Sequence, residues 1–177
     1  CSMGIFASGL RKQSKVRGVG PMIFVTVSTG HFDPLIRHCN DLSDRFEFFG
    51  QVGMGHVEPN FKHVRTCTPE ELARYMNEAE LVVSHAGTGM LSTLYKLQRP
   101  AIVIPKQIRY GEANDGQVEL AKKWGELDLG LLCMDIQDLE KSIERCRQKN
   151  FKFARRPSLG KSITESLGWK ASSVSAA

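Results

Sequence analysis

The chain has 177 residues, 41% of them hydrophobic, and its 24 lysines and arginines outnumber its 19 aspartates and glutamates, which gives a formal net charge of +5. This length and composition suit one domain with its own core, and they exclude collagen, a coiled coil and disorder along the whole chain. No apolar run approaches the roughly 18 residues of a membrane-spanning helix, and residues 1–20 lack the apolar core of a secretory signal, so we expect a soluble protein.

Short apolar runs alternate with helical patterns from residue 21 to residue 148. Each change falls near Gly, Pro, Asp or Asn, which interrupt regular structure. We predict strands at Met22–Ser28, Arg45–Gly50, Val64–Thr66, Leu81–Ser84, Ala101–Ile104 and Gly130–Met134, and helices at Pro34–Leu42, Pro69–Asn77, Gly89–Leu97, Gly116–Trp124 and Ile136–Arg147. This alternation indicates an α/β domain in which a Rossmann-like parallel sheet has helices on both faces.

Capping signals support two of the helices. Thr68 precedes Pro69, and Glu71 follows the cap by three residues, which predicts a capping box. Asp135 can cap the last helix, in which Ile136, Leu139 and Ile143 share one face. These residues are expected to be structural.

Positive charge gathers at the two ends of the chain. Residues 1–20 carry four basic and no acidic residues, and residues 145–177 carry eight basic residues against Glu165, so the middle has a net charge of −6. We therefore divide the chain into a basic extension (1–20), an α/β domain (21–148) and a basic segment (149–177), in which Ser158–Trp169 is predicted to form a short amphipathic helix before a disordered end. The ends suggest contact with an anionic membrane surface or an acidic partner, but solvated tails would have the same composition.

Nucleic acid and metal are poor candidates as ligands. The basic ends lack RNA-binding signatures and basic repeats interleaved with aromatic residues. The cysteines are Cys1, Cys39, Cys67, Cys133 and Cys146, with no C-x-x-C pair and no histidine at ligand spacing. We expect reduced thiols in a cytosolic compartment and no structural zinc site.

The segment SHAGTG, residues 84–89, is the strongest candidate for a binding site. It joins a buried strand to a helix, and its two glycines, Gly87 and Gly89, would let a ligand approach the backbone. The N–H groups at the helix start favour phosphate, and a diphosphate is the natural ligand, although G-x-G is also typical of an ordinary tight turn. The segment is neither a dinucleotide fingerprint nor a P-loop, and Ser84 with His85 lacks the G-x-S-x-G elbow of an acyl-transfer site.

Two further polar patches follow neighbouring strands. Lys106, Glu112 and Gln117 lie in the stretch after the strand at Ala101–Ile104, where their charges and amide suit a sugar nucleotide, unless this is only a solvated loop. After the first strand come Ser28, Thr29, Gly30 and His31; the first three could donate to phosphate, while a histidine here is often a packing or capping residue. In a doubly wound sheet, all three patches share the carboxyl edge.

At these residues the chain resembles a known family. SHAGTG, the R-P and I-P that follow, and the Y-G-E…N-D-x-Q-x-E-L-A stretch are similar to the donor-sugar half of the MurG-like glycosyltransferases, as are MIFVTVSTGHFDPLI and FEFFGQVG. The resemblance covers about residues 22–146. It is closer to stand-alone subunits containing only that half, which serve eukaryotic lipid-linked oligosaccharide synthesis and bacterial exopolysaccharide or capsule synthesis. The sequence from Pro105 to Glu112 resembles the bacterial subunits.

The resemblance implies one half of a GT-B glycosyltransferase fold that binds a UDP-sugar. Gly87, Thr88 and Gly89 match the diphosphate-binding turn, and His85 and Gln117 match positions near the phosphates and sugar. The resemblance also implies metal-independent, inverting chemistry with no cofactor. The acceptor and general base would belong to a membrane-anchored partner, with the pair cytoplasmic at the inner face of the membrane.

Two departures from the family pattern bear on selectivity and turnover. Thr93 stands where relatives usually carry the acidic residue that holds the ribose, and Gly116 replaces the histidine of an Asn/Asp-His-Gln motif. Glu112 could replace one lost contact. The expected function is the UDP-sugar-binding subunit of a two-component transferase. The alternatives are a non-catalytic nucleotide-sugar-binding module of regulatory or assembly type, and a hydrolase acting through Ser84 and His85.

Overall fold

The computed structural model describes residues 21–112, 115–149 and 151. Its strands are β1 (Ile23–Thr26), β2 (Phe48–Gln51), β3 (Lys62–Val64), β4 (Leu81–His85), β5 (Ala101–Ile104) and β6 (Gly130–Leu132). Its helices are α1 (Asp33–Leu42), α2 (Pro69–Glu78), α3 (Thr88–Lys96), α4 (Gln117–Glu126) and α5 (Leu139–Gln148), with short 3-10 helices η1 (Ile108–Tyr110) and η2 (Ile136–Asp138). The basic extension and the predicted helix at 158–169 lie outside the described residues.

The strands form one parallel sheet in the order β3-β2-β1-β4-β5-β6. The chain winds outward from β1 to β3 and then returns to place β4 on the other side of β1. The direction of winding therefore reverses between β1 and β4. In doubly wound sheets, ligands bind outside the carboxyl ends of the strands at this reversal.

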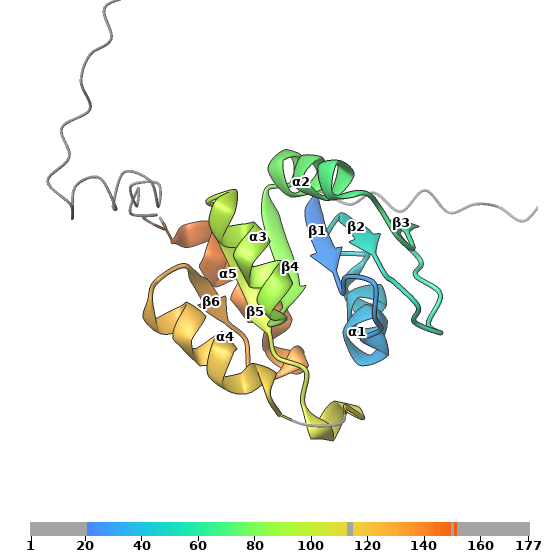
Figure 1. The fold of residues 1–177 in the computed structure, drawn as a ribbon. Coiled ribbons are helices and arrows are strands. Elements are labelled where there is room, and N and C mark those ends of the chain that lie inside the picture. The colour runs from blue at the N-terminus through green and yellow to red at the C-terminus, as the bar shows by residue number, and fades with distance from the viewer. Residues whose placement is uncertain (1–20, 113–114, 150, 152–177) are drawn as a thin grey trace, which may run out of the picture.

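Helices cover both faces of the sheet, with α1 and α5 on one face and α2, α3 and α4 on the other (Figure 1). Alternate residues of β1 divide between the two cores: Ile23 and Val25 pack on the α1 and α5 side, and Phe24 packs on the α2 and α3 side. Because both faces are buried, the central strands are continuous apolar runs, as the sequence predicted. No helix among the described residues is long and apolar enough to span a bilayer.

The capping box of α2 is confirmed. The Glu71 N–H donates to Thr68 Oγ1 at 3.2 Å, and the Thr68 N–H donates to Glu71 Oε2 at 2.9 Å. The predicted last helix is wrong in its first turn, because Ile136–Asp138 is the 3-10 helix η2. Asp135 caps this turn by accepting from the Gln137 N–H, and α5 begins afterwards without a side-chain cap.

Two predicted strands were misplaced. Arg45 does not open β2, because the amides of Arg45 and Phe46 donate to the Leu42 carbonyl and continue the turn that ends α1. The third strand lies two residues earlier than expected, where Lys62–Val64 pairs with Phe49–Gln51 of β2. The turn that continues from α1 therefore sets the start of β2, while pairing with the distant β2 sets the position of β3.

Candidate functional site

The predicted patches meet at the carboxyl edge of the sheet. The loop after β1 (27–32) and the turn after β4 (86–87) lie on either side of the winding reversal. Residues 105–112 and 115–116 follow β5, which pairs with β4, so they lie on the other side of the turn. We call His85, Lys106, Glu112 and Gln117 the donor cluster, because these predicted donor-site residues interact with one another at this edge.

The first turn of α3 has the arrangement of an anion-binding site. Gly87 is the N-cap, and no side chain caps the helix. Helical hydrogen bonding begins when the Leu91 N–H donates to the Gly87 carbonyl at 2.9 Å. The amides of Thr88, Gly89 and Met90 precede that bond, where a helix has no internal acceptor for them and its dipole favours negative charge.

The two glycines of the turn have different surroundings. A Cβ on Gly89 would meet nothing within 4 Å, so the space on the side-chain side of this residue is open. A Cβ on Gly87 would collide with the His85 ring. The expectation that both glycines make room for a ligand therefore needs correction: Gly87 makes room for His85, and Gly89 leaves room for a ligand.

His85 is 9% exposed, and its imidazole is neutral at pH 7. Burial, reinforced by the positive charge of Lys106, lowers the pKa of the ring from 6.5 to about 4, against opposing effects of Gln117 and Glu112. Nδ1 accepts a hydrogen bond from the Gly87 N–H at 2.9 Å, so the proton of the neutral ring is assigned to Nε2. His85 thus supports the turn from inside the protein, and its low pKa makes it a weak general base.

The loop after β1 begins with an unusual backbone conformation. Ser28 has a φ of 62°, a left-handed conformation that is rare for serine, and its N–H donates to Thr26 Oγ1 at 3.1 Å. Thr29, Gly30 and His31 are exposed beyond it. The carbonyl of His31 accepts a hydrogen bond from Lys106 Nζ, so His31 is held through its backbone.

Gly53, which the sequence analysis did not single out, supports this loop from behind. Its φ is +57°, and a Cβ there would collide with the Gly30 carbonyl. That carbonyl accepts from the Met54 N–H at 2.8 Å. In the sequence, Gly53 is marked only as a glycine that follows a predicted strand. That position does not reveal its contact with the distant Gly30 carbonyl.

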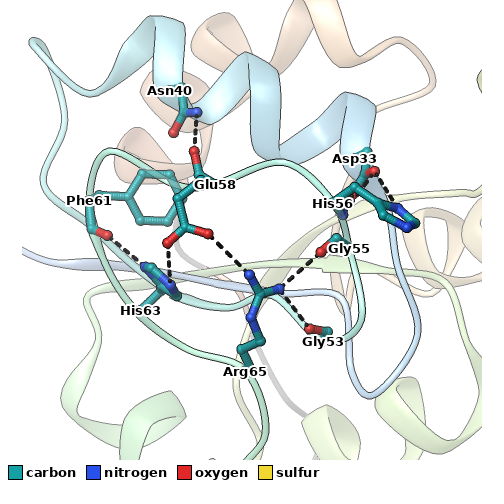
Figure 2. A network of polar contacts seen from close by, with 9 residues as sticks. All are labelled: Asp33, Asn40, Gly53, Gly55, His56, Glu58, Phe61, His63 and Arg65. Carbon is teal, nitrogen blue, oxygen red and sulfur yellow. Dashed lines mark hydrogen bonds and ion pairs between the residues drawn. The ribbon is translucent and has the colours of Figure 1, made fainter.

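Further polar contacts hold the β2–β3 connection in place (Figure 2). We call Asp33, Asn40, Glu58, His63 and Arg65 the β2–β3 network. Arg65 donates to the Gly55 carbonyl at 2.9 Å and to Glu58 Oε2 at 3.0 Å, and Asn40 Nδ2 donates to the Glu58 carbonyl at 3.1 Å. Both oxygens of Asp33 accept from the His56 N–H at 3.1 Å. These contacts fasten the connection to α1 and to the end of β3.

Thr93 and Ser84 have contacts that limit their roles. Thr93 Oγ1 donates to the Gly89 carbonyl at 3.0 Å, so this hydroxyl bonds its own helix. Ser84 is fully buried, and its hydroxyl donates to the His85 carbonyl at 3.0 Å instead of the imidazole. The hydrolase hypothesis therefore lacks the required pairing of nucleophile and base.

The described part of the chain contains no group of three or more His, Cys, Asp or Glu residues that could hold a metal ion. Its four cysteines, Cys39, Cys67, Cys133 and Cys146, are unpaired thiols. Burial raises the pKa of Cys146 to about 12 and that of Cys39 further, so both are unreactive at neutral pH.

The chain is similar in sequence to known transferase subunits. Human UDP-N-acetylglucosamine transferase subunit ALG13 is 34% identical over 116 residues, which cover 57% of this chain and 10% of that protein. The mouse protein is 32% identical over 114 residues, covering 56% and 10%. The chain thus spans about a tenth of the length of these curated relatives.

Solved structures share the fold. An NMR solution structure of ALG13 has a TM-score of 0.54 at 19% identity, with 83% of this chain and 94% of that chain covered. Spinosyn forosaminyltransferase SpnP has a TM-score of 0.51 at 15% identity, with 74% and 36% covered. At these identities the likeness shows the fold alone, a Rossmann-like domain of GT-B type. Residues 22–165 match the model of the glycosyltransferase family 28 C-terminal domain, and the chain belongs to this family.

Proposed function

We propose that this domain is the donor-binding subunit of a two-component inverting glycosyltransferase that uses a UDP-sugar. The observation that carries the proposal is the uncapped start of α3 at the winding reversal, with open space above Gly89. A diphosphate placed there would accept hydrogen bonds from amides that the helix leaves without internal acceptors. The similarity to ALG13, whose name describes a UDP-N-acetylglucosamine transferase subunit, supports a uridine nucleotide.

The reaction follows from this placement of charge. The acceptor hydroxyl attacks the anomeric carbon, the bond from that carbon to the phosphate oxygen breaks, and UDP leaves with the electron pair. The amides at the start of α3 stabilise the negative charge that grows on the leaving diphosphate, without a metal ion. His85 holds the turn and has a pKa of about 4, so the general base that takes the hydroxyl proton is assigned to the partner subunit.

The partner proposed here is a membrane-anchored acceptor-binding subunit, and the product is a lipid-linked glycan for bacterial exopolysaccharide or capsule. The complex would be cytoplasmic, at the inner face of the membrane. The basic ends would dock to the partner or to anionic lipid. Removing residues 150–177 should then reduce co-purification with the partner or binding to anionic vesicles; unchanged values in both assays would contradict this role.

Thr93 favours a second candidate, a non-catalytic nucleotide-sugar-binding module. Its hydroxyl bonds the Gly89 carbonyl, and a threonine cannot supply the carboxylate that relatives place on the ribose. Calorimetric titration with UDP-glucose, UDP-galactose, UDP-glucuronate and UDP-N-acetylglucosamine, followed by transfer and hydrolysis assays with and without the partner, separates the candidates. Binding with partner-dependent transfer supports the transferase, binding without turnover supports the module, and no binding of any uridine ligand rejects both.

A further inference from the structure

Lys106 connects two loops of the candidate site. It lies two residues after β5, and its ammonium donates a hydrogen bond to the carbonyl of His31 in the loop after β1. Nζ also lies 3.5 Å from Glu112 Oε1 and 5.7 Å from the centroid of the Phe32 ring. The three partners come from both sides of the winding reversal.

The backbone of Lys106 is held as well. Its N–H donates to Oε1 of Gln117, the first residue of α4, at 3.2 Å. Gln117 also hydrogen-bonds His85, which in turn holds the Gly87 N–H. A continuous chain of contacts therefore runs from the loop after β1, through Lys106 and Gln117, to the turn that begins α3.

The ion pair is shielded from solvent, with 14% of the Lys106 side chain and 18% of the Glu112 side chain exposed. Such a pair offsets the cost of removing two charges from water only while both partners remain in place. An ammonium already engaged by a carbonyl, a carboxylate and an aromatic face is committed to the protein.

We infer that Lys106 is a positioning residue, which holds the loop at Ser28–His31 against residues 105–112 and thereby shapes the diphosphate site without contacting the donor. The inference deepens the proposed function and rests on it. It also revises the expectation that Lys106 and Glu112 bind the donor directly: Glu112 is the counter-ion of Lys106, and the pair supports the loop that faces the ligand.

The test uses Lys106→Met in the 177-residue chain, because methionine keeps the side-chain stem over Phe32 and removes the ammonium. The amide NMR signals of Gly30 and His31 should shift in the ligand-free protein, and UDP affinity should fall about tenfold, equivalent to about 1.4 kcal/mol. Lys122→Met is the matched control, since Lys122 pairs with Glu119 on the exposed face of α4. It should change neither quantity.

The titration of His85 reports separately on the Lys106 charge, because the charged neighbours of the ring are Lys106 and Glu112. Loss of the Lys106 charge leaves Glu112 to attract a proton, so the NMR titration midpoint of the His85 ring should rise in Lys106→Met. In Lys106→Met/Glu112→Gln the midpoint should return toward the wild-type value, while the loop shifts and the weaker UDP binding persist. The double variant also gives both readouts if the single variant does not fold.

Three results would overturn the inference. The first is unchanged loop signals in Lys106→Met, and the second is shifted loop signals without a loss of UDP affinity. The third is recovery of UDP affinity in the double variant, which would mean that the balance of charge, and not the loop, determines the affinity. The loop signals and the His85 titration are measured without ligand. Failure of the wild-type protein to bind any uridine ligand would therefore contradict the proposed function separately, leaving these readouts interpretable.

Discussion

The β2–β3 network and the donor cluster are both rich in polar contacts, but they differ in what they leave unbonded. In the β2–β3 network, side chains meet carbonyls, carboxylates and amides of the same connection, and the ion pair is open to water, with Glu58 71% and Arg65 46% exposed. The donor cluster is shielded, yet the first-turn amides of α3 beside it have no side-chain cap. The polar contacts of the β2–β3 network therefore hold a loop in place. The free N–H groups at the start of α3, which lie beside a shielded cluster, are instead typical of a binding site.

The largest expected effect comes from Gly89→Asp, which should weaken UDP binding by at least about 100-fold. The side chain has room, and a carboxylate in the first turn favours the helix dipole, so the melting temperature should stay the same or rise. The same carboxylate repels the diphosphate from the adjacent amides. Calorimetric titration checks the affinity, with Gly89→Asn as the uncharged control of equal size. Equal affinities for the two variants would place the diphosphate elsewhere.

Gly87→Val should instead damage the fold. The new Cβ would collide with the His85 ring, so we expect the free energy of unfolding to fall by about 3 kcal/mol, as for an overpacked core. Chemical denaturation measures this loss. His85→Ala removes the ring that the valine would meet. Gly87→Val should therefore lower the free energy of unfolding by less in the His85→Ala background than in the wild type. The same cost in both backgrounds would contradict the assigned contact.

The buried neutral His85 makes stability depend on pH. Its folded pKa of about 4 lies below its ordinary value of 6.5, so the unfolded chain binds the proton more tightly. The contribution of neutral His85 to the free energy of unfolding is complete above pH 6.5 and is lost as the pH falls toward 4. About 2 kcal/mol of it is lost by pH 5. His85→Asn keeps an acceptor for the Gly87 N–H but does not titrate. The difference in unfolding free energy between wild type and this variant should shrink by that amount from pH 7 to pH 5; a constant difference would mean that His85 titrates normally.

The smallest effect is expected in the β2–β3 network. Asn40→Ala removes the hydrogen bonds from Asn40 Nδ2 to the Glu58 carbonyl and from the Asn60 N–H to Asn40 Oδ1. Unfolding free energy should fall by about 1 kcal/mol, because both bonds are exposed, while UDP affinity should change less than twofold. Asp41→Ala, on the same helix, controls for a general loss of helix stability. A tenfold loss of affinity in Asn40→Ala would show that the network also shapes the binding site.

Local signals in the sequence were sufficient for much of the fold. The alternation of apolar runs with helical patterns predicted the doubly wound sheet, and Thr68 with Glu71 predicted a capping box that the structure confirms. The turn at residues 84–89 was found because a glycine-containing segment links a buried strand to a helix. Each of these signals depends on residues close together in the chain.

The features that local signals could not supply depend on contacts across the chain. Gly87 accommodates His85, Gly53 meets the Gly30 carbonyl, and Lys106 bonds the carbonyl of His31, 75 positions away in sequence. Residue type suggested that Lys106 binds a phosphate or sugar. Its partners within the protein became visible only when the two loops were brought together.

A UDP titration followed in the amide NMR spectrum of the chain shows whether the first turn of α3 binds the diphosphate. We expect saturable shifts that are largest at Thr88, Gly89 and Met90 and small along α5. Shifts confined to Tyr95, Leu120 and Trp124, which line a cavity of about 330 Å³ between α3 and α4, would contradict this assignment. So would a spectrum that UDP leaves unchanged.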